Sequence, residues 1–151
     1  MPNVGGAVVP HRAPKPKRPL SLEDEEQMRA ILTILNLVVE QAGENFIYAV
    51  DDGDDLCRYV KDGKPDCIIG HTLHWYGISL ESLSAWEGSA CENMATYNPW
   101  SASIPLIPVA PVVLETLQVA QAKQDSGQTW GDARDAALFY AYTEHGVKLH
   151  A

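Results

Sequence analysis

The most informative stretch of the sequence is residues 66–88, DCIIGHTLHWYGISLESLSAWEG. Its apolar residues recur at helical spacing on both sides of Gly77, which predicts two short helices joined by a tight turn. Asp66 is expected to cap the first helix, and Gly88 to terminate the second. The stretch permits three interpretations: a helix-turn-helix DNA reader, a Cys/His metal site, or a structural core.

The flanking sequence predicts further helices and one β-hairpin. Residues 21–42 begin with Ser21 and a run of acids and continue with apolar residues at helical spacing, which is typical of a capped helix. Residues 46–50 and 56–60 are rich in β-forming residues and flank a polar loop, so they are expected to pair as the hairpin. After a long connection, two more helices are expected, one starting at Pro108 or Pro111 and one covering residues 129–145.

Length and composition are those of a globular chain with one domain. The chain has 151 residues, of which 46% are hydrophobic and 21% charged, enough to bury a core without disulfides or a metal. The longest apolar runs are far too short to cross a bilayer, so no membrane contact is expected. Three cysteines without a signal-peptide pattern predict reduced thiols and a cytoplasmic location.

Charge divides the chain into a basic arm, residues 1–19, and a single acidic helical domain, residues 20–151. The arm carries Arg12, Lys15, Lys17 and Arg18 and no acid, whereas the domain carries seven basic and 20 acidic residues. The acidic domain repels phosphate backbones, so nucleic acid is not the expected partner. The Pro-rich arm has too little apolar surface to fold, and we expect it to be flexible. Its four cations are the candidates for binding a partner.

Residues 66–88 resemble the helix-turn-helix of phage repressors. Gly77 stands at the turn glycine of that motif, and Leu83 and Trp86 stand where it buries two residues. Leu73 departs from the motif, which needs a small residue there. The resemblance implies DNA reading by the second helix, yet the exposed positions of that helix offer no Arg, Lys, Asn or Gln to bases or phosphates. A structural corner is therefore favoured over a DNA-binding regulator.

Cysteine and histidine spacing permits a zinc site. Cys67, His71 and His74 fall on one face of a helix, and Cys57 lies just upstream in a predicted strand. Together they would make a Cys₂His₂ set, the chemistry of structural zinc. The two cysteines are farther apart than common zinc-ligand pairs, so zinc is the alternative and no cofactor is the expectation. No orienting group or oxyanion donor accompanies Cys67 and His71, and no catalytic residue is assigned.

The layout of residues 57–77, together with Gly127-Gln128-Thr129-Trp130, is similar to that of small uncharacterised proteins of actinobacteria and their phages. The resemblance implies an origin and a compact helical fold, and it implies no activity. We expect a mainly α protein of about five helices, with a small β-hairpin and a flexible N-terminal arm. For function we favour a non-enzymatic acidic accessory protein, encoded by a phage, that binds a host or phage protein. A helix-turn-helix regulator and a zinc-stabilised domain are the alternatives.

Overall fold

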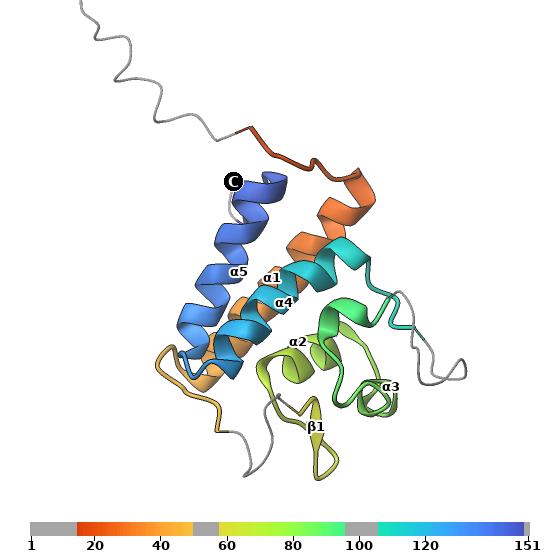
Figure 1. The fold of residues 1–151 in the computed structure, drawn as a ribbon, viewed down its shortest axis with the longest axis vertical. Coiled ribbons are helices and arrows are strands. Elements are labelled where there is room, and N and C mark those ends of the chain that lie inside the picture. The colour runs from red at the N-terminus through yellow and green to blue at the C-terminus, as the bar shows by residue number, and fades with distance from the viewer. Residues whose placement is uncertain (1–14, 50–57, 96–105, 150–151) are drawn as a thin grey trace, which may run out of the picture.

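The computed structural model describes residues 15–49, 58–95 and 106–149. Within these ranges the chain is mainly helical, with five α-helices, one 3₁₀ turn and one two-stranded antiparallel hairpin, which confirms the expected fold class. Three long helices stand together, and the shorter elements lie on one side of them (Figure 1). The described residues include no helix that is long and apolar enough to span a membrane. In chain order the elements are α1 (Leu22–Ala42), β1 (Val60–Lys61), β2 (Lys64–Pro65), α2 (Ile68–Tyr76), α3 (Leu80–Ser84), η2 (Cys91–Asn93), α4 (Pro111–Asp125) and α5 (Trp130–His145).

Helix α1 forms where the sequence predicts it. The Ser21 side chain accepts a hydrogen bond from the Asp24 amide at 3.1 Å, and three acids occupy the first turn, where the helix dipole favours them. Gly43 ends the helix with a φ of +100°, a conformation that glycine adopts without strain. One face of the helix is buried between residues 28 and 39, through Met28, Ile31, Leu32, Leu35, Val38 and Val39.

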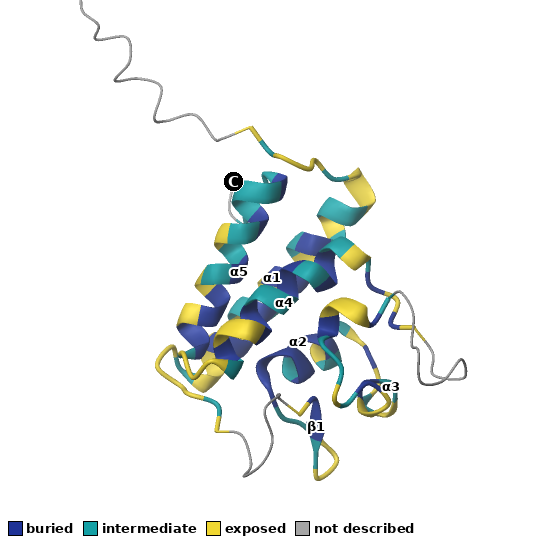
Figure 2. Cartoon of the chain, in the orientation of Figure 1, coloured by how far each residue is buried: buried dark blue, intermediate teal, exposed yellow. Residues whose placement is uncertain are grey.

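Helices α4 and α5 pack closely on each other and on α1. Pro111 stands in the first turn of α4, where its missing amide hydrogen costs no helical hydrogen bond. The Thr129 side chain caps α5 by accepting from the Asp132 amide at 3.0 Å. Small side chains on the inner face of α5 let the helices approach closely, and that face is dark blue in Figure 2. These fully buried residues are Ala133, Ala137 and Ala141.

The β-hairpin lies later in the chain than the sequence indicated. Val60 pairs with Pro65 and Lys61 with Lys64, and the turn between them has positive φ at Asp62 and Gly63. Two such residues are what a two-residue hairpin turn requires. Of the strands predicted at 46–50 and 56–60, residues 46–49 form only an isolated bridge between Ile47 and Thr129, and residues 50–57 lie outside the described part.

Helices α2 and α3 differ in detail from the prediction. Cys67, and not Asp66, is the N-cap of α2, and its side chain makes no capping hydrogen bond. The Gln124 side chain of α4 instead accepts from the Ile68 amide at 2.9 Å. Helix α3 ends at Ser84 instead of reaching Gly88. Tight turns follow it, with the Trp86 amide bonded to the Leu83 carbonyl, and they bury the Trp86 side chain to 1% exposure.

Candidate functional site

A hollow of about 400 Å³ opens where the end of α1 meets the starts of α2 and α5. Aromatic side chains form much of its wall, and an aspartate and a histidine lie among them. We call it the aromatic hollow. It is lined by Val38, Gln41, Ala42, Phe46, Pro65, Asp66, His71, Trp75 and Trp130.

Backbone contacts hold the aromatic walls in place. The Trp130 amide donates to the Phe46 carbonyl at 2.8 Å, and the Gly131 amide donates to the Glu44 carbonyl at 3.0 Å. These bonds bring the ring of Phe46 to 4.6 Å from that of Trp130 at a steep angle of 68°. The indole Nε1 of Trp130 donates to Gln124 at 3.1 Å, which fixes the second wall. The segment after α1 is therefore tied directly to the first turn of α5.

His71 and Asp66 supply the titratable groups of the aromatic hollow. The His71 ring meets the Trp130 ring edge-on at 5.8 Å. Burial lowers the pKa of His71, and His74 adds to this while Asp66 opposes it, so the imidazole is neutral at pH 7. The Asp66 carboxylate accepts a hydrogen bond from the Tyr48 hydroxyl. Burial and this bond raise the pKa of Tyr48, so the phenol stays a donor.

The predicted zinc ligands are not brought together among the described residues. Cys57 lies outside the described ranges, and Cys67 is fully buried at the start of α2. His71 faces the aromatic hollow, whereas His74 Nδ1 lies 3.0 Å from the Ile78 carbonyl oxygen at the other end of α2. No group of three His, Cys, Asp or Glu side chains in the described ranges is placed to hold a metal ion.

The described end of the N-terminal arm lies against the domain. The Arg18 amide donates to the Glu144 carbonyl at 2.8 Å, and the Arg18 guanidinium contacts Glu115 at 3.1 Å and the Tyr140 hydroxyl at 2.8 Å. Lys17 pairs with Glu144 at 3.2 Å. Two of the four candidate partner-binding cations are therefore paired within the chain. Lys15 is exposed, and Arg12 lies outside the described ranges.

The helix-turn-helix-like corner places its polar residues differently from a DNA reader. Helix α3 has five residues, and Glu81 and Ser84 are exposed on it. Glu87, three residues after α3, is partly buried and accepts from the Tyr59 amide at 2.6 Å. Leu83 and Trp86 are buried, as the resemblance implied.

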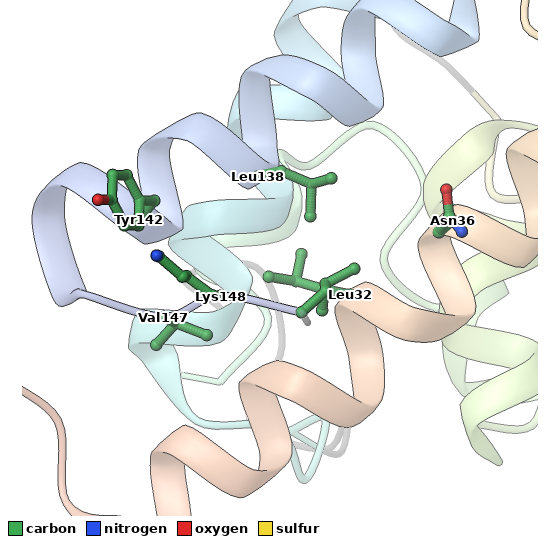
Figure 3. Close-up of a pocket in the computed structure, with 7 residues that line it drawn as sticks. Leu32, Asn36, Leu138, Tyr142, Val147 and Lys148 are labelled. Carbon is green, nitrogen blue, oxygen red and sulfur yellow. The ribbon is translucent and has the colours of Figure 1, made fainter. Parts of the chain in front are cut away.

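A second hollow, the α1/α5 groove, has a volume of about 440 Å³ (Figure 3). Leu32 from α1 and Leu138 from α5 face it from opposite sides, and the segment after α5 lies across it. Its polar groups are already engaged: the Asn36 amide bonds to Arg134 at 3.2 Å and to Glu40 at 3.1 Å, and Lys148 Nζ sits 5.2 Å from the Tyr142 ring centre. Leucine and valine side chains make up most of the lining of the α1/α5 groove, whereas the aromatic hollow combines aromatic rings with the Asp66 carboxylate.

Phe46 and Trp130 were not predicted as site residues. Phe46 was assigned to a strand and Trp130 to the first turn of a helix, and their meeting depends on a contact between residues 84 positions apart. The signal available in the sequence was the aromatic character of both. Comparisons of the chain with protein-family models, with curated protein sequences and with solved structures each found no match.

Proposed function

We propose that this chain is a non-enzymatic accessory protein that acts by binding another protein through the aromatic hollow. The observation that carries the proposal is the exposure of Phe46 and Trp75, each 42% accessible, at the rim of a concave site whose inner wall is Trp130. Aromatic side chains at a concavity are characteristic of binding sites, and tryptophan is among the residues that contribute most to protein interfaces.

The rigidity of the aromatic hollow supports a binding role. Its walls come from α1, α2 and α5, and backbone hydrogen bonds join the segment at Phe46 to the start of α5. A site that is already ordered loses little conformational entropy when a partner docks. The aromatic hollow is therefore suited to recognition without rearrangement.

The chemistry of the lining also favours binding over catalysis. The described residues that line the aromatic hollow include no Ser, Thr, Cys or Lys that could serve as a nucleophile. The Asp66 carboxylate holds the Tyr48 hydroxyl, and His71 interacts with Asp66 through charge and through the Asp66 backbone. In this proposal the His71 ring forms part of the wall of the aromatic hollow. The partner is a host or phage protein, in keeping with the resemblance of the chain's layout to proteins of actinobacteria and their phages.

The proposal is tested by affinity capture with matched variants. Tagged full-length protein is cross-linked in a lysate of an actinobacterial host, and the captured protein is then purified for affinity measurement. Trp75→Ala should weaken binding by at least about 30-fold if this side chain is an interface hot spot. Phe139→Ala removes an aromatic side chain that is 69% exposed on α5, away from the hollow, and should leave the affinity within about twofold.

A deletion of residues 1–14 tests whether partner binding depends on the aromatic hollow or on the N-terminal arm. The proposal requires that this deletion retain most of the affinity and that Trp75→Ala remove it. The opposite result, with binding lost on deletion and retained in Trp75→Ala, would assign the interaction to the arm and overturn the hollow as the contact surface.

A further inference from the structure

We infer that the aromatic hollow recognises a cationic side chain, a lysine or an arginine, of its protein partner. This inference rests on the proposed function and specifies the chemistry of the partner. Three aromatic rings, one carboxylate and the negative end of a long helix meet in a single concavity.

The aromatic rings are arranged as walls and not as a stack. Phe46 and His71 both meet Trp130 at steep angles, 68° and 66°, and Trp75 lines the same hollow from α2. Rings set at steep angles can present faces toward a shared space, and the faces of aromatic rings attract cations. Aromatic cages of this kind recognise ammonium and guanidinium groups. The walls therefore suit a cation better than an aliphatic group of the same size.

The charge of the lining also favours a cation. Among the described residues that line the aromatic hollow, Asp66 and His71 are the titratable ones, and His71 is neutral at pH 7 because burial lowers its pKa. The Asp66 carboxylate is oriented by the Tyr48 hydroxyl, and a carboxylate can accept further hydrogen bonds after the first. Asp66 therefore offers both a charge and acceptor capacity to an incoming ammonium or guanidinium group.

The end of α1 adds to the negative potential. Val38, Gln41 and Ala42 line the aromatic hollow from the last turns of this 21-residue helix. The C-terminal end of a helix carries a partial negative charge, which basic side chains in the last turn often neutralise. The last turn of α1 contains no basic residue of its own, and the nearby Arg134 of α5 is paired with Glu44.

An anion is the competing occupant, because α2 and α5 both begin at the aromatic hollow. The first-turn amides of α5 and the first amide of α2 already have acceptors within the chain. The Ile68 amide donates to Gln124 at 2.9 Å, the Trp130 amide to the Phe46 carbonyl at 2.8 Å and the Asp132 amide to the Thr129 side chain at 3.0 Å. These bonds occupy the donors at the start of α5 and one donor at the start of α2, which weakens anion binding at these helix starts.

The net charge of the chain agrees with a basic partner. The formal net charge is −9 at pH 7, and a surface of this sign attracts a positively charged segment at long range. A hollow of about 400 Å³ lies in the size range of small-molecule sites and admits one long side chain. A lysine or arginine in a basic segment would thus be steered to the protein by its overall charge and seated by the rings and Asp66.

The test uses full-length protein and four capped pentapeptides that differ at the central residue. That residue is lysine, arginine, norleucine or citrulline, with glycine on both sides. Binding is followed by NMR through the indole N–H signals of Trp75 and Trp130. The lysine and arginine peptides should shift these signals and bind at least about tenfold more tightly than their neutral isosteres, with an affinity that falls as salt is added.

Two charge variants test how much the Asp66 carboxylate contributes to binding. Asp66→Asn keeps an oxygen for the Tyr48 hydroxyl but removes the charge. It should lower the affinity for the lysine and arginine peptides by about tenfold. Glu81→Gln removes an exposed charge on α3, outside the hollow, and should change the affinity by less than about twofold. If Asp66→Asn does not fold, the four peptides on the unaltered protein decide the question.

Equal binding of the norleucine and lysine peptides would overturn the cation inference but leave the proposed function standing. Tighter binding of sodium acetate than of methylammonium chloride would also overturn it, in favour of an anion. Methylguanidinium chloride that binds more tightly than the arginine peptide would assign the hollow to a free cation and not to a partner side chain. No shift from any cationic probe, together with a captured partner unaffected by Trp75→Ala, would refute the inference and the proposed function together.

Discussion

The three long helices and residues 58–95 are held to the rest of the molecule by different kinds of contact. Helices α1, α4 and α5 bury continuous apolar faces against one another. The segment that contains the hairpin, α2, α3 and η2 also packs apolar side chains against the long helices, and side chains from α4 bond to its backbone in addition. The difference shows that regular helices satisfy their own backbone, whereas an irregular segment needs donors and acceptors from a neighbour.

A row of glutamines on α4 provides those partners. Gln124 accepts from the Ile68 amide at 2.9 Å, and Gln121 accepts from the Cys91 amide and donates to the Tyr59 hydroxyl, both at 3.0 Å. Gln118 accepts from the Glu92 amide at 3.3 Å. Their spacing of three residues keeps all three on one face of the helix. Gln121 and Gln124 are 2% and 1% exposed, so these bonds form away from water.

The two regions also achieve close contact in different ways. In the helical group, alanines on α5 give a short distance between helices. At α2 the helix touches the backbone before β1, where a Cβ atom added at Gly70 would lie 2.1 Å from the Tyr59 carbonyl oxygen. A real Cβ atom cannot occupy that position, so only glycine fits unless the two segments move apart.

Gly70→Ala is expected to have the largest effect. The new methyl group would push α2 away from the hairpin segment and should lower the free energy of unfolding by about 4 kcal/mol. The higher helix propensity of alanine offsets about 1 kcal/mol of the clash and is included in this figure. Urea unfolding followed by circular dichroism measures the loss.

Gly131→Ala is the matched control at the start of α5. Its Cβ atom would lie 2.7 Å from the Glu44 carbonyl oxygen, a milder clash than the 2.1 Å approach at Gly70. A loss of about 2 kcal/mol is expected. If the two variants lost the same stability, the contact between α2 and Tyr59 would not be the tighter of the two.

Gln124→Leu should have the second-largest effect. The leucine side chain has a similar size but leaves the Ile68 amide and the Trp130 indole N–H without their acceptor. Unfolding should become easier by about 2–3 kcal/mol, since each buried donor that loses its partner costs free energy. Gln128→Leu, at an exposed position after α4, should change stability by less than about 0.5 kcal/mol. Near-equal stability of the two variants would contradict a structural role for the glutamine row.

The sequence predicted the long helices well because their signals are local. Ser21 and Thr129 cap the helices that the apolar spacing indicated, and Gly43 and Gly146 end them. The hairpin was misplaced because the prediction followed the β-forming residues at 46–50 and 56–60, whereas the observed turn is at Asp62 and Gly63. Residue type alone could not distinguish two adjacent candidate hairpins.

The parts that could not be predicted depend on contacts between distant residues. Glutamines at helical spacing on α4 look like a solvent-facing row, and their burial follows only once residues 58–95 cover that face. The aromatic hollow likewise arises where Phe46 meets Trp130, far apart in the chain. His71 was singled out as a metal ligand, and its place in the hollow follows from which neighbours the fold gives it.

The smallest expected effect concerns two carboxyl groups, one in each region. Glu44, after α1, pairs with the nearly buried Arg134 at 2.7 Å, and this hydrogen bond and charge lower the pKa of the carboxyl group below its ordinary value near 4.5. Glu87, after α3, is partly buried, and this burial raises the pKa of its carboxyl group despite the bond from the Tyr59 amide. The pH dependence of stability should therefore have opposite signs at the two positions.

For Glu44, the stabilisation is present above the carboxyl pKa of the unfolded chain and is lost as the pH falls through the lower folded pKa. Glu44→Gln should accordingly be less stable than the unaltered protein at pH 7, and the difference should shrink below about pH 4. For Glu87, folding favours the protonated form, so its contribution is fully present below about pH 4.3 and is lost as the pH rises through the higher folded pKa. Glu87→Gln should gain stability relative to the unaltered protein between pH 4 and pH 7, by well under about 1 kcal/mol because solvent screens this site. Urea midpoints of the three proteins across this range give both slopes, and slopes of the same sign would show that the two carboxyl groups do not differ as their surroundings indicate.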